Sequence, residues 1–348
     1  MSAPSSSSIR LKADTTRLVV IAPNWLGDAV MALPAIADIR HHYAEAHLAI
    51  AARPPVAPLF TMVKGVDQLI GLPGRWQTHA PELEAGAFDI SVLLPNSFAT
   101  ALIAKNAGIP VRCGFATDFR GWLLTRALPR PGGTTHQSEY YQALTTGLGI
   151  PAGPAFATVW PDADHARQIL REVGLDLDEP LVVFAPGAAY GRAKQWLPER
   201  FAQLADLIIN GRGWNVLMVG SNADRSTCAD IASRLPATGN RINRLIDLSG
   251  KTDLPSLAGV LSLARAVVSN DSGAMHLAGA VGAKVVAIFG ATNETRTSPL
   301  ASGADAPRPA IVSHEVFCRP CMLRECPIDH RCMSGISAAR VFEEVVST

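Results

Sequence analysis

Asp28 is placed where a carboxylate could act on a substrate proton. It follows the β-branched run at residues 17–22, which predicts a strand buried on both faces, and a loop at Gly27 that opens a predicted helix. A carboxylate at a helix N-terminus is stabilised by the helix dipole and can cap free backbone N–H groups. Asp28 is therefore either a plain helix cap or a general base facing a substrate cleft. Pro34, inside the helical pattern, marks a kink or a first helical turn.

A second loop with chemical potential follows the predicted strand at residues 181–185 and reads Pro-Gly-Ala-Ala-Tyr-Gly-Arg-Ala-Lys. Its small residues allow backbone N–H groups to approach an anion, and Arg192 and Lys194 supply charge-assisted hydrogen bonds. This pattern is typical of a phosphate clamp. Basic loop residues are also common as solvated surface, so that alternative stays open here.

The third loop is Asn-Asp-Ser-Gly at residues 270–273, after a predicted strand at 266–269. The helix that follows begins with free amides that can bind a phosphate, and Ser272 adds a hydroxyl while Gly273 permits close approach. Helix capping alone would explain Asp271 or Ser272, and a core contact would explain His276. The four polar and small positions together favour a ligand site.

Between residues 105 and 130 the chain carries five basic residues and Asp118 as its only acid. We interpret this stretch as either an ordinary solvated face or a docking surface for an anionic acceptor. The basic residues are Lys105, Arg112, Arg120, Arg126 and Arg130.

Four of the six cysteines crowd into 15 residues, with the spacing C-x2-C-x4-C-x5-C. That density suits a tetrahedral structural zinc site made of four cysteines, or of three cysteines with His330 as substitute ligand. The alternative is a compact loop that packs reduced thiols as small apolar groups. In either case we expect a structural role, because the loop is far in sequence from the other motifs. The four are Cys318, Cys321, Cys326 and Cys332.

Length and composition limit the class of protein. A chain of 348 residues predicts two domains, and 48% apolar with 18% charged residues indicates a folded globular protein. A net charge of +1 excludes a general field for nucleic acid. No apolar run reaches the roughly 18 to 20 residues of a membrane span, and residues 1–16 are polar without a signal-peptide core. We expect these residues to be disordered and the protein to be cytoplasmic.

The elements that must position these residues alternate between strand and helix, and the rhythm restarts in the second half. Pro-rich residues 151–162 separate the halves, so we place a boundary near 165. This predicts two doubly wound α/β domains across a cleft, with ligands at the C-terminal ends of the strands. Strands are predicted at 17–22, 47–51, 89–94, 181–185, 215–219, 266–269 and 284–289, and helices at 97–107, 198–211, 223–235, 254–264 and 273–281.

Together, the motifs at residues 24–28, 186–196 and 270–276 resemble the lipopolysaccharide heptosyltransferases, glycosyltransferase family 9. The resemblance covers residues 17–345, and the Pro-Gly-Ala loop and the Cys-rich tail look closer to the heptosyltransferase II branch than to heptosyltransferase I. It implies the GT-B fold, with an acceptor-binding Rossmann-like domain at 17–165 and an ADP-heptose-binding one at 166–348. It also implies inverting transfer of L-glycero-D-manno-heptose from ADP-heptose to the first heptose of the inner core on Kdo-lipid A.

The resemblance implies roles by position. Asp28 is the base for the acceptor hydroxyl, Lys194 and the amides at 272–273 hold the diphosphate, and Asp271 contacts the heptose. The implied donor and phosphate-binding residues are Gly187, Ala188, Ala189, Lys194, Asp271, Ser272, Gly273 and His276. Nucleoside contacts are placed by position at Asn222, Asp224, Leu248 and Thr252. Acceptor contacts are placed at Asn24, Trp25, Arg112, Arg120 and Arg126.

The implied partners are ADP-heptose, a lipid A-linked acceptor and the cytosolic face of the inner membrane, touched transiently, with no nucleic acid. No cofactor is required beyond the zinc alternative at the cysteines. Three rival activities are kept: heptosyltransferase I or III on another acceptor, an NAD-dependent oxidoreductase, and a non-catalytic nucleotide-binding module. Neither half shows the G-x-G-x-x-G fingerprint of NAD-binding domains, and a binding module leaves Asp28 without a task.

Overall fold

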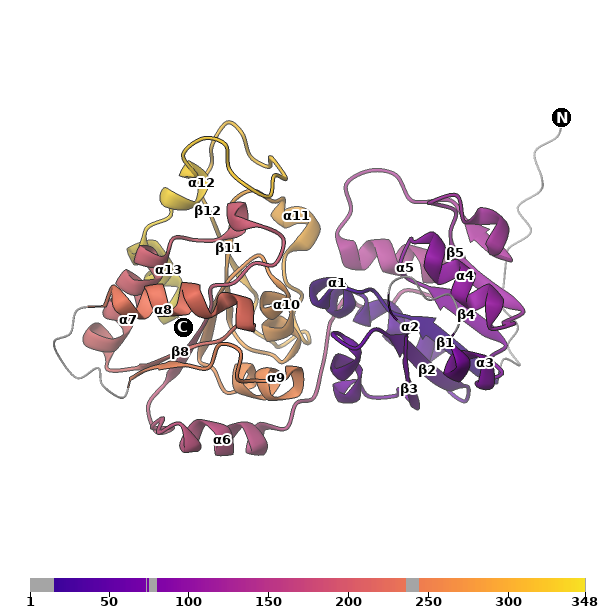
Figure 1. Ribbon diagram of the computed structural model, residues 1–348, viewed down its shortest axis with the longest axis horizontal. Helices are drawn as coiled ribbons and strands as arrows, with labels where there is room; N and C mark the ends of the chain where they lie inside the picture. Colours follow the sequence, from indigo (N-terminus) through magenta and orange to yellow (C-terminus); the bar gives the residue numbers. More distant parts are fainter. Residues whose placement is uncertain (1–15, 73, 75–79, 236–243, 348) are drawn as a thin grey trace. The chain divides into compact units, whose positions relative to one another are not determined.

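The computed structural model describes residues 16–72, 74, 80–235 and 244–347. The chain divides into two compact units, the first ending at Ala157 and the second beginning at Thr158 (Figure 1). All of the segment predicted to be disordered, apart from Thr16, lies outside the described residues. Each unit is a doubly wound α/β domain, so the predicted fold class is confirmed.

The first unit is built on a parallel sheet with the strand order β3-β2-β1-β4-β5-β6 among the described residues. Its strands are β1 (Arg17–Ile21), β2 (His47–Ala52), β3 (Gln68–Gly71), β4 (Ile90–Leu93), β5 (Val111–Phe115) and β6 (Arg126–Leu128). Its α-helices are α1 (Leu26–Met31), α2 (Leu33–His42), α3 (Pro81–Ala85), α4 (Phe98–Asn106) and α5 (Gln137–Gly147).

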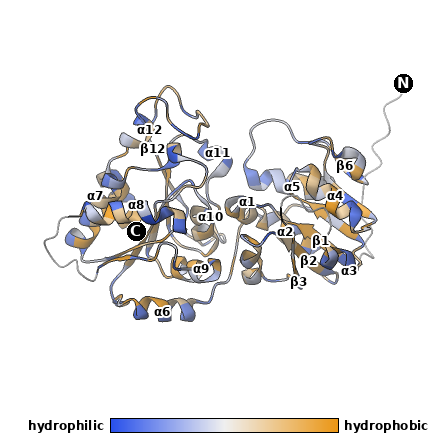
Figure 2. Cartoon of the chain, in the orientation of Figure 1, coloured by the Kyte–Doolittle hydropathy of each residue, from blue (hydrophilic) through white to orange (hydrophobic). Residues whose placement is uncertain are grey.

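Side-chain alternation gives this sheet two buried faces. Val19 and Ile21 of β1 join a core with residues of α3 and α4, and the intervening β1 side chains point to the opposite face. Figure 2 shows the strands as predominantly hydrophobic, as a sheet covered on both faces requires. Pro34 lies in the first turn of α2, which settles the two alternatives for it in favour of a helix start.

The second unit has a parallel sheet with the strand order β12-β11-β10-β7-β8-β9 among the described residues. Its strands are β7 (Leu181–Ala185), β8 (Asn215–Met218), β9 (Leu245–Asp247), β10 (Ala266–Asn270), β11 (Val285–Phe289) and β12 (Ala310–Ser313). Its α-helices are α6 (Ala163–Glu172), α7 (Pro198–Arg212), α8 (Arg225–Ser233), α9 (Leu254–Ser262), α10 (Gly273–Ala280), α11 (Glu294–Thr297), α12 (Arg331–Ser334) and α13 (Ala338–Val346).

Local sequence explains where the main helices of this unit begin and end. Helix α7 has Pro198 in its first turn, where a missing N–H costs nothing, and Gly213 closes it in the left-handed conformation. Asp253 caps α9 by accepting a hydrogen bond from the backbone N–H of Ser256 at 2.8 Å. Helices α7, α8 and α13 share one apolar core with the strands. Helix α6 packs on α9 and belongs to this unit, so the division falls earlier than the boundary placed near 165.

Candidate functional site

The second and third motifs meet at one edge of the second sheet. Strands β7 and β10 are parallel neighbours with Ala185 opposite Ser269, so the loops that leave their C-terminal ends lie next to each other. The chain winds to one side of β7 through β8 and returns to the other side through β10, which makes this the topological switch point. Open α/β sheets bind ligands at such points.

Asn270 holds the two loops together. Its side chain is fully buried, its Oδ1 accepts a hydrogen bond from the backbone N–H of Trp196 at 2.9 Å, and its Nδ2 donates to the carbonyl of Pro186 at 2.7 Å. A buried amide with both ends satisfied fixes the backbone it contacts. The loop at residues 186–196 is therefore set by β10, a constraint that the sequence analysis missed.

Lys194 and Asp271 form a buried ion pair at the centre of this edge. Lys194 Nζ lies 2.6 Å from Asp271 Oδ2, and the side chains are 15% and 6% exposed. The same oxygen accepts a hydrogen bond at 2.7 Å from Thr292 Oγ1, a buried hydroxyl just after β11. Thr292 was missed as well, although its position after a strand is the pattern shared by the other motif residues.

The loop that carries Lys194 is otherwise small and partly buried. Ala188 is buried and Ala189 is exposed, while Gly187 lies so close to Asp224 that a Cβ atom there would be 2.3 Å from Asp224 Oδ1. Arg192, the other basic residue of the loop, is exposed. The structure thus singles out Lys194 as the cation fixed at the sheet edge.

Helix α10 begins beside this pair. Ser272 occupies its N-cap position without a side-chain cap hydrogen bond, and its Oγ lies 3.1 Å from Ser269 Oγ. Ser272 therefore occupies the N-cap position, but its hydroxyl caps no amide, and the first amides, from Gly273 onward, have no capping side chain. Uncapped amides and the helix dipole favour an anion here. His276 is buried within α10.

The residues placed at the nucleoside by position follow β8 and β9 at the same edge. Asp224 Oδ2 accepts hydrogen bonds from both the backbone N–H and the hydroxyl of Ser221, each at 2.8 Å. The Asn222 side chain lies against Gly250, where a Cβ would be 2.2 Å from its Oδ1. Thr252 is half-buried. Leu248 is 2% exposed and belongs to the core, so its side chain is not accessible to a ligand.

In the first unit, Asp28 lies in the first turn of α1, directly after β1. The N-cap of α1 is Trp25, not Asp28, so the plain-cap interpretation is wrong. Tyr141 of α5 is buried and shares a hydrogen bond with Asp28; burial, together with the negative charge of Asp28, raises the pKa of Tyr141 well above 10. The phenol therefore stays protonated and donates to the carboxylate, which it holds in place. The sequence analysis did not identify Tyr141.

The basic stretch is exposed at Lys105, Arg126 and Arg130, but not at Arg120. Arg120 is fully buried: its Nε donates to the carbonyl of Phe115 at 3.0 Å, and its guanidinium also donates to the carbonyl of Pro95. Burial lowers the pKa of Arg120 to about 10. Arg112 donates to the carbonyl of Leu123 at 2.7 Å. The prediction of surface docking is wrong for Arg120, because its donors are used to hold the chain's own carbonyls.

Two exposed aromatic side chains also belong to this stretch. Phe119 is 95% exposed and Trp122 is 67% exposed. Arg126, Asn24 and Trp25 are also exposed, so those three remain available to an acceptor.

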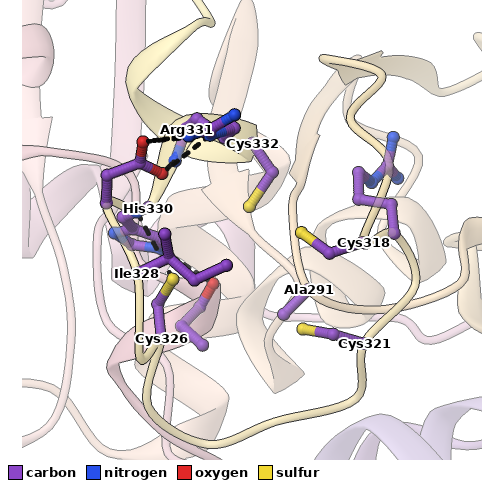
Figure 3. Close-up of a pocket in the computed structure, with 11 residues that line it drawn as sticks. Ala291, Cys318, Cys321, Cys326, Ile328, His330, Arg331 and Cys332 are labelled. Atoms are coloured by element: carbon purple, nitrogen blue, oxygen red, sulfur yellow. Dashed lines mark hydrogen bonds and ion pairs between the residues drawn. The ribbon is translucent and has the colours of Figure 1, made fainter.

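The four clustered cysteines line one cavity of about 20 Å³ in the second unit (Figure 3). Among the residues that the structure describes, no three His, Cys, Asp or Glu side chains are already gathered as metal ligands.

Across the same part of the chain, no helix combines the length and apolar character that crossing a membrane requires.

Comparison with known proteins agrees with this geometry. Residues 76–331 match the family model described as glycosyltransferase family 9 (heptosyltransferase). Lipopolysaccharide heptosyltransferase 2 of Salmonella typhimurium is 29% identical over 317 residues, covering 86% of this chain and 90% of the relative. Lipopolysaccharide heptosyltransferase 3 of Escherichia coli is 23% identical over 288 residues, covering 78% and 82%. The solved structure of ADP-heptose lipopolysaccharide heptosyltransferase II from Escherichia coli superposes with a TM-score of 0.80 at 25% identity, covering 95% and 97%.

Proposed function

Because the chain belongs to glycosyltransferase family 9, we propose that it transfers L-glycero-D-manno-heptose from ADP-heptose to the first heptose of the lipopolysaccharide inner core. Its fold is the two-domain α/β GT-B architecture, and the relatives named heptosyltransferase 2 match more of the chain at higher identity than those named heptosyltransferase 3. The observation that carries the proposal is the convergence of Lys194, Asp271 and the start of α10 at one sheet edge.

This edge of the second unit suits a departing nucleoside diphosphate. When the bond to the sugar breaks, negative charge develops on ADP, and a fixed ammonium and helix-terminal amides stabilise that charge without proton transfer. Lys194 supplies the ammonium, and the amides from Gly273 onward supply the dipoles. Asp271 and Thr292 keep Lys194 in place before the donor binds.

The first unit supplies the base. Asp28 accepts the proton of the acceptor hydroxyl as that hydroxyl attacks the anomeric carbon, and inversion follows from a single displacement. The Tyr141 hydroxyl donates a hydrogen bond to the carboxylate of Asp28 and thereby fixes the orientation of that carboxylate. The strand-to-helix loops after β1 and β7 lack the three-glycine pattern typical of nicotinamide dinucleotide binding.

The activity is tested by incubating the protein with ADP-heptose and either Kdo-lipid A or its monoheptosylated form, followed by mass spectrometry of the lipid. A gain of one heptose on the monoheptosylated lipid alone is expected. A gain on Kdo-lipid A alone would contradict the acceptor and indicate a heptosyltransferase I activity. Stabilisation by NAD and not by ADP in a thermal-shift assay would contradict the reaction class.

We further propose that the exposed aromatic residues of the first unit contact the anionic membrane surface that carries the acceptor. Phe98 is 36% exposed, and its ring centroid lies 6.1 Å from that of Trp122. Lys105 Nζ lies 4.8 Å from the Trp122 ring centroid. Aromatic rings flanked by basic side chains suit the interface of an anionic bilayer.

The backbone turn that presents these rings is strained. Asp118 and Phe119 have φ values of 52° and 53°, a left-handed conformation that is strained for a side chain as bulky as Phe. The turn is held because Asp118 Oδ2 accepts a hydrogen bond from the backbone N–H of Phe98 at 2.7 Å and because the buried Arg120 binds neighbouring carbonyls. A strained turn that exposes an aromatic ring indicates a use for that ring.

Sedimentation with phosphatidylglycerol-containing vesicles tests this contact. Phe119→Ser and Trp122→Ser should each weaken vesicle binding and raise KM for a vesicle-embedded acceptor, while ADP affinity stays unchanged. Trp160→Ser is the matched control, because Trp160 is 47% exposed on the second unit. Vesicle binding that is equal in all four proteins would contradict the membrane contact.

A further inference from the structure

The cysteine-rich loop, residues 318–332, surrounds a cavity about as large as one water molecule. Figure 3 shows the sulfur atoms of the four cysteines directed into the space between the two arms of the loop. The cavity measures about 20 Å³, which is room for a single small occupant. Cys332 is 6% exposed, and the other three are half-buried, so the cavity can be reached from solvent. The four are Cys318, Cys321, Cys326 and Cys332.

Polar groups lie beside these sulfur atoms. Cys326 Sγ accepts a hydrogen bond from the backbone N–H of His330 at 3.3 Å, and the side chains of Arg319 and Arg331 line the same cavity. Four cysteine sulfur atoms around one small cavity are the donor set of a tetrahedral zinc site.

The same loop also braces the loop that carries Lys194. The backbone N–H of Ala193 donates to the carbonyl of Arg324 at 2.9 Å, and the Tyr190 hydroxyl donates to the carbonyl of Met322 at 3.0 Å. At Gly191 the contact is so close that a Cβ atom would lie 2.3 Å from the Arg324 carbonyl oxygen. The cysteine-rich loop is thus far from the donor motifs in sequence but in contact with one of them in the structure, so a structural role there can act on the Lys194 loop.

His330 connects the cavity to the Lys194 loop directly. Its Nε2 lies 3.0 Å from the carbonyl oxygen of Ala193, and since a carbonyl only accepts, Nε2 is the donor. Ala193 itself lines the cysteine cavity and precedes Lys194 in the chain. This hydrogen bond leaves Nδ1 as the one ring nitrogen of His330 that could bind a metal, whereas all four cysteines line the cavity, so a site of four cysteines is complete without the histidine.

We propose that the four thiols bind one Zn²⁺ ion and that this ion fixes the loop that presents Lys194 to the donor diphosphate. Zn²⁺ is a borderline-soft ion that binds well to thiolates. When the four thiols bind it, they release their protons to solvent. The described side chains are not yet gathered as ligands. Binding would draw the sulfur atoms to about 2.3 Å from the ion and would tighten both arms of the cysteine-rich loop. The link to the diphosphate rests on the proposed function.

The metal site is tested on the full chain, purified without chelator or affinity metal. Elemental analysis should find about one zinc per chain, lost in Cys321→Ser and Cys326→Ser and retained in Cys113→Ala, whose cysteine is buried in the first unit. Absence of metal, with four thiols titratable in the cysteine-rich loop on unfolding, would overturn the site.

The link to the donor is tested by calorimetry with ADP. Removing zinc from the wild type with a chelator should raise the Kd for ADP about 5- to 100-fold, the usual size of coupling between sites, and adding Zn²⁺ should restore it. His330→Ala should keep the zinc and still weaken ADP binding, because it breaks only the bond to Ala193. A Kd unchanged by zinc removal would overturn the link.

The two proposals fail in different ways. A zinc-loaded wild type that does not bind ADP at all would overturn the proposed function and the link with it, whereas the metal content alone decides the zinc site. Circular dichroism of the zinc-free wild type shows whether the second unit is still folded, so a loss of ADP binding by unfolding is told apart from a loosened loop. Zinc-free protein that unfolds would contradict a role confined to the Lys194 loop.

Discussion

Replacing Lys194 by Met should weaken ADP binding by more than the loss of one contact. A charge-assisted hydrogen bond is worth about 1.5 to 3 kcal/mol, which corresponds to a Kd increase of about 10- to 150-fold. The ion pair adds a second effect, because Asp271 is 6% exposed and loses its cation in the variant. A carboxylate about 6 Å from a phosphate, at an effective dielectric constant of about 20 to 40, repels it by about 1.5 to 3 kcal/mol.

The double variant Lys194→Met/Asp271→Asn separates these two effects. It lacks the same ammonium but has no carboxylate to repel the diphosphate, so it should bind ADP about tenfold or more tightly than Lys194→Met. Asp271→Asn alone should bind ADP at least as well as the wild type, since Lys194 keeps its charge and loses its competing partner. ADP carries no heptose, so its affinity reports the diphosphate contacts without any contribution from a sugar contact at Asp271.

Isothermal titration calorimetry of the four proteins with ADP measures this cycle, and thermal unfolding of each checks that the second unit is intact. Two results would refute the reasoning. One is a Lys194→Met variant whose ADP affinity lies within about twofold of the wild type. The other is a double variant that binds no better than Lys194→Met, which would mean that Asp271 does not act on the diphosphate through its charge.

Three further predictions concern the first unit. Asp28→Asn should lower kcat by about 10²- to 10⁴-fold with ADP affinity unchanged; a variant keeping a tenth of wild-type kcat would contradict the base. Arg120→Met should lower the unfolding temperature by about 5 °C or more because it removes the buried hydrogen bonds to the carbonyls of Pro95 and Phe115, whereas the exposed Arg126→Met should change stability by less than about 0.5 kcal/mol; equal shifts would contradict this. Hydrogen bonds from the backbone N–H of Arg17, above all, lower the pKa of Asp89 in the folded state, so its contribution is present near neutral pH and is lost as pH falls below about 4. Asp89→Asn should therefore lower the unfolding temperature more at pH 7 than at pH 3, and a deficit of equal size at both pH values would contradict the linkage.

The sequence predicted the central strands well because their cause is local. Residues 17–22, 181–185 and 266–269 are short β-branched or apolar runs between loop residues, and all three are strands in the structure. The shorter outer strands β3, β6, β9 and β12 were not predicted, since each has three or four residues and partial exposure, and so carries little periodicity. Strand β5 was missed because its five residues, Val-Arg-Cys-Gly-Phe, include an arginine and a glycine and form no continuous apolar run.

The site was predicted as far as its motifs are contiguous. Lys194 and Asp271 stand in loops that any parallel sheet would bring to one edge, so their proximity followed from the strand order alone. Their supports come from elsewhere in the chain: Thr292 after β11 for the carboxylate, and Tyr141 of α5 for Asp28. Thr292 could have been found from its position after the predicted strand at 284–289, whereas nothing in the sequence distinguishes Tyr141 from any other Tyr.

Arg120 shows why a charged residue cannot be assigned to a surface from composition. Counting cations between residues 105 and 130 treats each as a solvated charge, yet a guanidinium can be buried where backbone carbonyls surround it and accept its N–H groups. Pro95 and Ser97, just beyond the end of β4, and Phe115, the last residue of β5, supply such carbonyls. Arg120 closes the ends of these two strands and thereby holds the turn that exposes Phe119. In the proposed contact with a lipid-linked acceptor, Arg120 therefore acts by positioning the aromatic residues and not by its own charge.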